Sequence, residues 1–314
     1  MNPKTKIQNL KFEFRDLECK FSREKFFFLF FIFVLLYPPQ KLRAQNKPCR
    51  YNEKTLQFIG KPVEQAYCLL RPNKIGGVLG EEIKKLPKPL ENLIGKKVKI
   101  KKENLRKYLQ SEKIDETNIG GPLNQSLSDA FLPNGKKISA LYFLIHDTSS
   151  PYLNDQSFPP DFDTNPEWSG NNLFVWFKQP VAHVFVNRLG ESVTIADFRE
   201  TVKKGWGTKF ARDVLKGKGK GLQLHIELVQ PRRRDATNLN TENDLIAPLP
   251  GFTDGQYERL ALLYICASLR RGTWLVPAYH SAIDAGIKDA HDDPQNFELY
   301  KFAAKIKFIL KKIP

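Results

Sequence analysis

The sequence predicts an α/β fold in which a mixed central β-sheet is flanked by helices and preceded by an N-terminal extension. Apolar runs of strand length at 140–145 and 222–229, a hairpin pattern at 183–195 and a helical pattern at 253–271 support this prediction. The chain has 314 residues, of which 41% are hydrophobic and 23 are Phe. It can therefore bury a proper core, as one large domain or two medium ones.

The chain is strongly basic, with a formal net charge of +16. Such a charge predicts attraction to polyanions, whether nucleic acid, an anionic membrane or an acidic cell-wall polymer. No aromatic RNA-binding set, helix-turn-helix pattern or paired-cysteine finger can be seen in the sequence, so nucleic acid is not an expected partner. The lysine excess equally fits a surface that is simply soluble.

Residues 1–44 predict a signal peptide or an N-terminal anchor. The apolar run at 26–37 follows basic residues and ends at two prolines. It is shorter than the ~20 apolar residues that span a bilayer, and this length is typical of the hydrophobic part of a signal peptide. Cleavage after Ala44 fits the pattern. We therefore expect an exported protein of the periplasm, cell envelope or medium, and an uncleaved anchor would keep it near the membrane.

Residues 45–135 are rich in Lys, Pro and Gly and contain no histidine. A short apolar piece at 98–100 predicts a small strand, and 104–110 predicts a short helix. We interpret the region as an extension that wraps a larger domain at 136–314. A separate accessory binding module is the alternative.

The four cysteines fit export. Cys19 would leave with the signal, and Cys266 lies in a helical pattern that favours a small buried thiol. Cys49 and Cys68 remain, and an oxidising compartment would permit a disulfide between them.

The apolar run at 140–145 predicts a strand buried on both faces, which places His146 at its end. The rim of a sheet is where ligand sites of α/β folds tend to lie. The next segment, 147–172, is rich in Pro, Asp, Ser and Gly and predicts a long loop, and long loops in compact domains are often functional.

Two further strands are expected at 174–177 and 183–187. The second is followed by a turn and a returning strand at 192–195, which predicts a hairpin. A basic segment at 216–221 precedes the strand at 222–229, and we interpret it as a solvated turn in preference to a flexible linker.

Alternation along 222–229 sets His225 and Glu227 on one face of that strand and Leu224, Ile226 and Leu228 on the other. An acid and an imidazole side by side favour a functional site over a solvated surface.

A capping box, Thr253 with Gln256, opens a helix that ends at Gly272. The apolar segment 274–279 then leads into His280. The tail at 302–310 predicts a basic amphipathic helix, for which surface packing is favoured over membrane binding.

All five histidines lie between 146 and 291. His146 and His280 each end an apolar run, and Asp293 follows beside a proline. A catalytic zinc site needs three protein ligands, commonly His with Asp or Glu, and one open position. Glu227 could act as a general base near such a metal.

Six short motifs follow one another over about 136–300: Leu144-Ile145-His146, Ala182-His183-Val184-Phe185-Val186 with Gly190-Glu191, Ile226-Glu227-Leu228, Gln256-Tyr257-x-x-Leu260, His280-Ser281 and Asp293-Pro294. This ordered series resembles the zinc-dependent N-acetylmuramoyl-L-alanine amidases of the amidase_2 and peptidoglycan-recognition-protein superfamily. The resemblance implies a mixed sheet flanked by helices. It also implies zinc-dependent cleavage, in peptidoglycan or muropeptides, of the amide that joins the lactyl group of muramic acid to L-Ala.

Carried over by position, the resemblance makes His146, His280 and Asp293 the zinc ligands. It makes Glu227 the catalytic base and His183 a groove residue. The zinc amidase domain would then occupy 136–314.

The sequence departs from the family pattern near the third ligand. Members place a Lys two residues before the Asp, where this chain has His291, while Lys288 keeps the usual distance from His280. His291 and Lys288 thus compete for the role of stabilising the oxyanion, and Asp292 or even His291 could replace Asp293 on the metal.

A second departure is Gly207, where relatives often carry a His after the Trp that stands here at 206. We expect it to alter substrate contacts rather than the metal. Trp206, His183 and His225 are the candidate substrate-binding residues.

Two rival interpretations remain at this stage. A module of the same fold could bind muropeptide without cutting it, as superfamily members with an incomplete metal site do, but the ligand set here is complete. A zinc hydrolase acting on another amide, such as a crosslink peptide, is the third interpretation. Oligomeric state is not predicted.

Overall fold

The computed structural model describes residues 48–74, 78–203, 206–234 and 246–314. Contacts divide the chain into two units, Met1–Gln45 and Asn46–Pro314, and the following concerns the second. The signal peptide or anchor expected at 1–44 lies outside the described residues. Among those described, no helix has the length and apolar character needed to cross a membrane.

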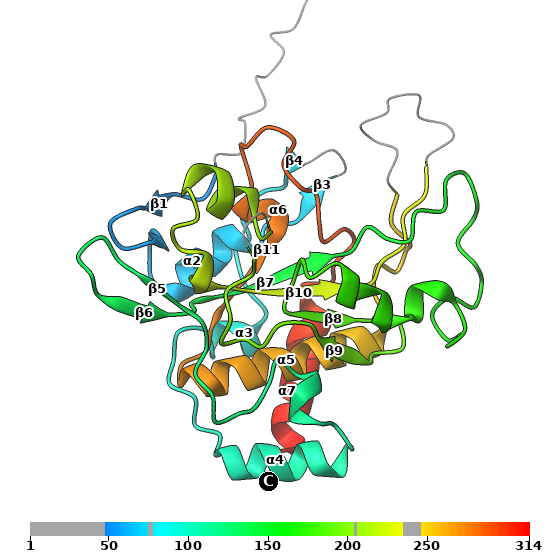
Figure 1. Cartoon of the computed structure of the whole chain (residues 1–314), viewed down its shortest axis with the longest axis horizontal. Helices are drawn as coiled ribbons and strands as arrows, with labels where there is room; N and C mark the ends of the chain where they lie inside the picture. Colours follow the sequence, from blue (N-terminus) through cyan, green and yellow to red (C-terminus); the bar gives the residue numbers. More distant parts are fainter. Residues whose placement is uncertain (1–47, 75–77, 204–205, 235–245) are drawn as a thin grey trace, which may run out of the picture. The chain divides into compact units, whose positions relative to one another are not determined.

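The prediction of a mixed α/β fold is confirmed by a five-stranded sheet in the order β11-β7-β10-β8-β9 (Figure 1). Four strands run parallel: β7 (Tyr142–Asp147), β8 (Val184–Val186), β10 (Gln223–Leu228) and β11 (Val276–Tyr279). The edge strand β9 (Ser192–Thr194) pairs antiparallel with β8 and forms the expected hairpin. Every residue of β7 is buried, as its uniformly apolar run requires.

The strand register brings the predicted site residues to one edge of the sheet. Glu227 of β10 lies opposite His146 of β7, and Tyr279 of β11 lies opposite Ile145. His280 follows Tyr279 directly and begins the short helix α6 (His280–Ile283). Because the three strands are parallel, their carboxyl ends meet at the same edge, where ligand sites of such sheets lie.

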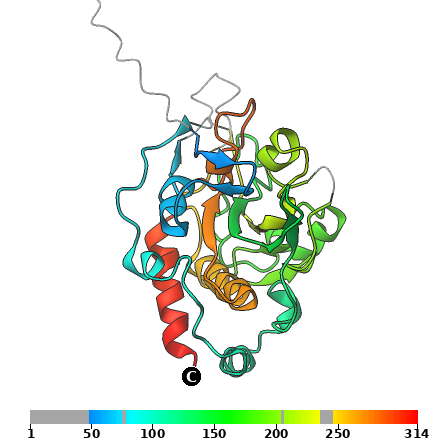
Figure 2. The ribbon, with the colours of Figure 1, turned by 90° about the vertical axis from the view of Figure 1, so that its left-hand side faces the viewer.

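Two long helices pack together beside the sheet. Helix α5 (Asp254–Arg271) begins with the predicted capping box of Thr253 and Gln256 and ends at Gly272, which has the left-handed φ of 82°. Figure 2 shows α5 nearly end-on and α7 (Leu299–Lys312) lengthwise, so the two helices cross at a large angle. Phe302 and Ile306 of α7 are fully buried in the core, so the tail helix packs on the protein as predicted.

Residues 48–135 share the core of the larger domain. Tyr142 of β7 accepts a hydrogen bond from the Phe58 backbone N–H at 2.9 Å and donates one to Gln65 at 3.1 Å. Leu69 and Leu105 are completely buried in the same core as the sheet. This supports an extension that wraps the domain rather than a separate module.

The elements of this extension are short, and the helix expected at 104–110 is confirmed as α4. They are β1 (Tyr51–Asn52), β2 (Gln57–Phe58), α2 (Pro62–Leu69), β3 (Asn73–Lys74), β4 (Val78–Leu79), α3 (Lys88–Glu91), α4 (Lys102–Ser111), η1 (Glu116–Asn118) and β5 (Asp129–Phe131), which pairs with β6 (Lys137–Ser139). Cys49 and Cys68, between which the sequence permits but does not decide a disulfide, are bonded, and Cys266 is a buried free thiol.

The strand expected at 174–177 is wrong, because Leu173–Lys178 forms a 3-10 helix, η3. The Asn172 side chain accepts a hydrogen bond from the Phe174 backbone N–H and starts the helical turn. Phe174 is 78% exposed and Phe177 is 52% exposed, so the apolar run does not signal a buried strand here.

A smaller expectation also fails. At 98–100 no strand forms, because the Val98 N–H binds the carbonyl of Gly272 and so contributes to the end of α5. The basic segment 216–221 forms a turn over 216–219 that is exposed at 216–218, so the solvated turn is confirmed there. Its last part begins η5 (Lys220–Leu222), and the buried Lys220 donates to the carbonyl of Trp206 at 2.6 Å. A buried ammonium group needs such acceptors.

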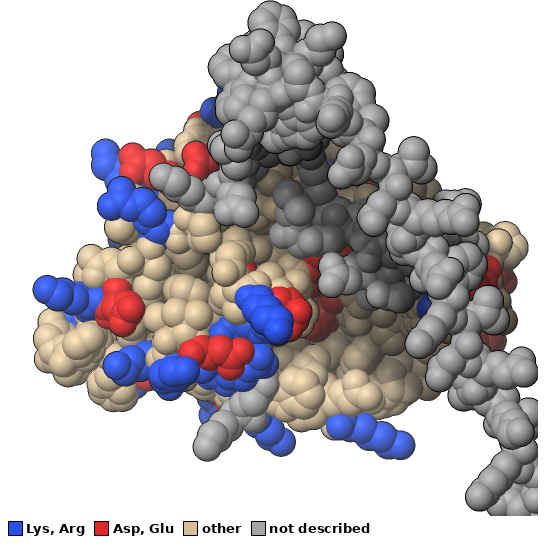
Figure 3. Space-filling view, turned by 90° about the horizontal axis from the view of Figure 1, so that it is seen from above, with Lys and Arg blue, Asp and Glu red and all other residues tan. Residues whose placement is uncertain are grey.

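The excess of basic residues does not gather in one place on the face seen from above. In Figure 3 the Lys and Arg side chains of the described residues project mostly around the rim, interspersed with Asp and Glu. The described part of this face thus offers scattered charge rather than a single basic track.

Candidate metal centre

His146, His280 and Asp293 come together at the carboxyl edge of the sheet. The two Nδ1 atoms of the histidines are 2.9 Å apart. Asp293 Oδ1 lies 2.9 Å from His280 Nδ1, and Oδ2 lies 3.4 Å from His146 Nδ1. All three residues are buried, and their ligand atoms lie within 4.8 Å of one another. This cluster could hold a metal ion.

The donor set fits zinc. Two imidazole nitrogens and one carboxylate are a common ligand set of catalytic zinc sites. Two Nδ1 atoms that face each other can share only one proton, so at least one needs another partner, and a cation would serve both. Burial, together with the charge of His280, lowers the pKa of His146 to about 4, so this ring is neutral at pH 7.

The carboxylate of the cluster is ionised. Burial alone would raise the pKa of Asp293, but His280 and His146 hold it well below its usual range. Burial likewise opposes the charging of His280, but Asp293 and Asp284 together raise the pKa of this imidazole well above its usual value. Without a cation, the cluster is therefore held together by an imidazolium and its carboxylates.

Glu227 stands beside the cluster on the neighbouring strand. Its Oε1 is 3.8 Å from His146 Nδ1, and its buried Oε2 has no hydrogen-bond partner among the described residues. Burial and the nearby Asp293 carboxylate raise its pKa well above the usual value. A carboxyl group with a raised pKa next to a candidate metal site is suited to proton transfer.

Asp284 was missed by sequence reasoning. Its Oδ2 lies 2.9 Å from His280 Nε2, the ring nitrogen opposite the cluster. Two backbone N–H groups hold the carboxylate in place, that of Phe210 at 2.8 Å and that of Lys209 at 3.0 Å. Metal-binding histidines commonly pair their second nitrogen with such a carboxylate. The signal was the spacing of four residues from His280, which places both on one face of a helical turn.

His291 adjoins this pair. Its ring stacks on that of His280 at 4.2 Å, and its Nδ1 lies 3.1 Å from Asp284 Oδ2. His280, Asp284 and His291 form a second group whose atoms are close enough for a cation. Because Asp284 is already engaged by two backbone donors, we interpret this group as the support of His280.

The structure separates the alternatives left open near the third ligand. Lys288 is exposed and does not line the cleft over the cluster, whereas His291 does. Asp292 accepts a hydrogen bond from Gln295 at 2.5 Å and lies outside the cluster. The geometry thus favours Asp293 as the ligand and His291 as the cleft residue.

His183 does not lie in the groove, which corrects the sequence-based expectation. It is completely buried. Its Nδ1 accepts the backbone N–H of His225 at 3.0 Å, and its Nε2 lies 3.0 Å from the Glu200 carbonyl oxygen. His225 is also buried, with Nδ1 2.9 Å from Nε2 of His146. Both residues are buried beneath the metal cluster and neither lines the cleft, so neither is placed to contact substrate.

All five histidines of the chain consequently form one row of neighbouring rings, in the order His291, His280, His146, His225 and His183. Adjacent ring centroids are 4.2, 4.3, 5.1 and 5.8 Å apart. The row crosses the edge of the sheet, from an exposed residue at one end to a buried one at the other.

A second missed feature is a buried ion pair that anchors the third ligand. Arg232 and Asp147 are both buried and lie 2.5 Å apart. The backbone N–H of Asp147 donates to Asp293 Oδ2 at 3.3 Å, and the Asp147 side chain accepts the Gln295 N–H at 2.9 Å. The partners are far apart in sequence, so no local pattern could have indicated them.

The cluster lies in an open cleft of about 330 Å³, whose lining includes Trp176, Trp206 and Arg212. Trp206 is 43% exposed and keeps its place as a candidate substrate contact. Gly207 has a φ of 89°, and a Cβ there would lie 3.5 Å from the His225 ring. A histidine at this position would be strained, which accounts for the glycine in this chain.

Comparisons with known proteins add no relative. No family model, no curated protein and no solved structure matches the chain. What can be concluded about the site therefore follows from its own geometry.

Proposed function

We propose that this protein is a zinc-dependent N-acetylmuramoyl-L-alanine amidase with the amidase_2 fold. It hydrolyses the amide between the lactyl group of N-acetylmuramic acid and L-Ala of peptidoglycan stem peptides. The observation that carries the proposal is the buried convergence of His146, His280 and Asp293, with Glu227 beside them in an open cleft. The ordered motifs assign the same residues the same roles.

His146, His280 and Asp293 would hold the zinc ion. When bound, zinc supplies the Lewis acidity that makes water nucleophilic at neutral pH and polarises the scissile carbonyl. Glu227 takes the proton of the attacking water and passes a proton to the leaving amine, a role that its raised pKa suits. His291 lines the cleft and can donate a hydrogen bond to the oxyanion, a contact worth roughly 3 kcal/mol.

An exported protein fits this substrate. The Cys49–Cys68 disulfide supports an oxidising compartment, since such bonds persist outside the cytosol. The basic net charge suits an acidic cell wall. We therefore propose that the protein acts in the periplasm, the cell envelope or the medium.

The non-catalytic alternative is disfavoured, because a module that only binds muropeptide needs neither a complete ligand set nor Glu227. A hydrolase of crosslink peptides would use the same machinery and differs only in which amide it cuts. Mass spectrometry of the products separates these outcomes. The proposed activity releases a peptide that begins with L-Ala and leaves the N-acetylmuramyl glycan intact.

The test is turnover of a defined muropeptide by the purified protein, with and without a zinc chelator. We expect chelation to abolish turnover and zinc to restore it. His280→Ala should lose both zinc and activity. Lys288→Ala is the control, because Lys288 is exposed and away from the cleft lining. Undiminished turnover in the chelated protein or in His280→Ala would refute the proposal.

A further inference from the structure

The N-terminal extension lies directly against the segment that carries the metal ligands. Its helix α2 contacts both β11 and α6, the helix that begins with His280 (Figure 1). Pro48 packs on the loop that follows α6, because a Cβ at Gly286 would lie only 2.7 Å from the Pro48 Cγ atom. The disulfide at Cys49 ties this start of the extension to α2. The extension is thus crosslinked where it meets the candidate metal centre.

Three aromatic rings join the extension to the π-helix η4 (Phe210–Val214). Tyr51 of β1 meets the Phe210 ring edge to face at a centroid distance of 4.9 Å, and Phe58 of β2 lies 5.8 Å from the same ring. Tyr51 and Phe58 also contact each other at 5.1 Å. Aromatic pairs in such arrangements stabilise packing beyond the area that they bury. Phe210 is therefore held in place by two rings of the extension.

Phe210 in turn holds the carboxylate behind the metal ligand. Its backbone N–H donates to Asp284 Oδ1 at 2.8 Å, and Asp284 Oδ2 lies 2.9 Å from His280 Nε2. Because Asp284 is completely buried, solvent cannot easily replace a backbone donor that moves away. A displacement of the Phe210 backbone would therefore reorient Asp284 and, with it, the His280 ring.

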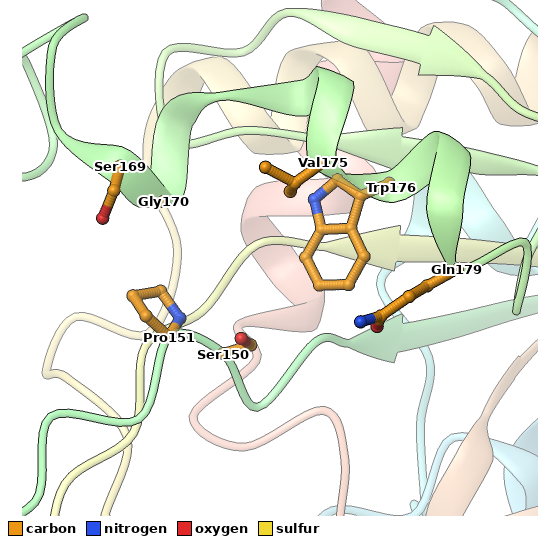
Figure 4. A pocket seen from close by; sticks show the side chains of 7 residues that line it. All are labelled: Ser150, Pro151, Ser169, Gly170, Val175, Trp176 and Gln179. Carbon is orange, nitrogen blue, oxygen red and sulfur yellow. The ribbon is translucent and has the colours of Figure 1, made fainter.

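The extension does not contribute to the surface of the cleft. All of the described residues that line the cleft follow it in the sequence. The neighbouring hollow of about 190 Å³, shown in Figure 4, is lined by the loop after β7, by η2 (Ser169–Asn171) and by η3 with its C-cap. An effect of Tyr51 on the centre must therefore act on the metal ligands and not on a contact with substrate.

We propose that Tyr51 is a positioning residue for the metal ligand His280, acting through Phe210 and Asp284. The extension thereby does more than complete the core, because it fixes the geometry of the candidate metal centre. The inference rests on the proposed function for the identity of the metal. The effect of Tyr51 on Phe210 and Asp284 is independent of it.

The first test measures the zinc affinity of the full-length protein by competition with a chelator of known affinity. Tyr51→Leu removes the ring and Tyr51→Phe keeps it. We expect Tyr51→Leu to weaken zinc binding about tenfold, the lower end of the roughly 10–100-fold loss that follows removal of the partner of a metal-bound histidine, because Asp284 itself remains. Tyr51→Phe should stay within twofold of the unsubstituted protein.

Tyr108→Leu is the matched control. Tyr108 is a more deeply buried tyrosine of the extension, but it lies on α4 and lines a pocket beside α5. Its replacement should therefore reduce stability at least as much as Tyr51→Leu does and leave zinc affinity within twofold.

Hydrogen exchange of the Phe210 backbone N–H in the metal-free protein is the second measurement, since its bond to Asp284 protects this N–H. We expect exchange at least tenfold faster in Tyr51→Leu than in Tyr108→Leu. Phe210→Leu keeps the N–H and removes the ring, so it should repeat the loss of zinc affinity, and it takes the place of Tyr51→Leu if that variant does not fold. The double variant should lose no more than either single one, because both remove the same contact.

The inference is overturned if Tyr51→Leu matches Tyr108→Leu in zinc affinity or in Phe210 exchange, or if the losses of the two single variants multiply in the double variant. The two proposals fail separately. A protein that shows these effects but cleaves no muropeptide keeps the positioning role and loses the amidase. If the unsubstituted protein binds no zinc, the amidase is lost, and the exchange comparison alone decides whether Tyr51 fixes Asp284.

Discussion

Replacement of Asp284 by Asn tests whether the carboxylate behind His280 is part of the metal centre. Asn keeps the size of the side chain and one oxygen that can still accept the Phe210 N–H. It removes the charge 2.9 Å from His280 Nε2 and can place an amide N–H donor against that nitrogen. Loss of such a partner typically weakens metal affinity 10–100-fold, which is about 1.4–2.7 kcal/mol.

The assay is competition for zinc between the purified protein and a chelator of known affinity. Asp289→Asn is the matched control, because Asp289 is exposed in the same loop and has a φ of 54°, which Asn tolerates. Circular dichroism and urea unfolding of the metal-free proteins would detect a general loss of structure, since Asp284 also binds two backbone N–H groups. A zinc affinity of Asp284→Asn within twofold of the control would refute the positioning role.

Three further predictions follow. Burial lowers the pKa of His183 from 6.5 to about 4. As the pH drops from 6.5 to 4, the unfolded chain takes up the His183 proton before the folded protein does, so the free energy of unfolding should fall by about 3 kcal/mol. Urea unfolding of metal-free His183→Gln should therefore show a flatter pH dependence. Replacing both Cys49 and Cys68 by Ser removes a crosslink between residues 19 positions apart. The unfolded chain gains freedom, so the free energy of unfolding should fall by about 3 kcal/mol. An unchanged urea midpoint would contradict this. Glu227→Gln should bind zinc at least as tightly as the unsubstituted protein and lose at least 100-fold in kcat for muropeptide, and retained turnover would remove the proposed base.

The parts of the fold that the sequence predicted correctly are those in which one local rule decides. The run at 140–145 is apolar throughout and became the fully buried strand β7. Thr253 and Gln256 close a capping box through contacts three residues apart, and α5 begins there. Burial on both faces, or a local hydrogen bond, is enough to fix such elements whatever the rest of the chain does.

The parts that failed depend on contacts that composition and alternation do not indicate. The run at 174–177 has the composition of a strand, but the Asn172 side chain caps the Phe174 N–H and the segment forms the 3-10 helix η3 outside the five-stranded sheet. His183 was expected in the groove. It lies on the inward side because its ring completes the hydrogen bonding of the His225 backbone, which alternation along one strand cannot indicate.

The candidate site was predictable to a similar degree. A residue that directly follows a parallel strand must lie at the carboxyl edge of the sheet, so the strand patterns alone brought His146 and His280 together. The choice of Asp293 over Asp292 depends on the course of the loop between α6 and Asp293, which contacts with Asp147 and His280 hold in place. No periodicity governs such a loop, and only the folded structure selects the ligand.

The energetics of the centre also favour a bound cation over a purely structural cluster. Glu227 Oε2 is a buried polar atom without a hydrogen-bond partner among the described residues. Such an atom costs about 1–3 kcal/mol. The imidazolium of His280 must, in addition, be kept charged against its burial. Hydrophobic side chains of similar volume would stabilise the same sheet edge at lower cost. A fold that keeps these groups buried beside an open cleft is better explained by a ligand that uses them, and a divalent cation with its water would satisfy the carboxylates and the facing ring nitrogens together.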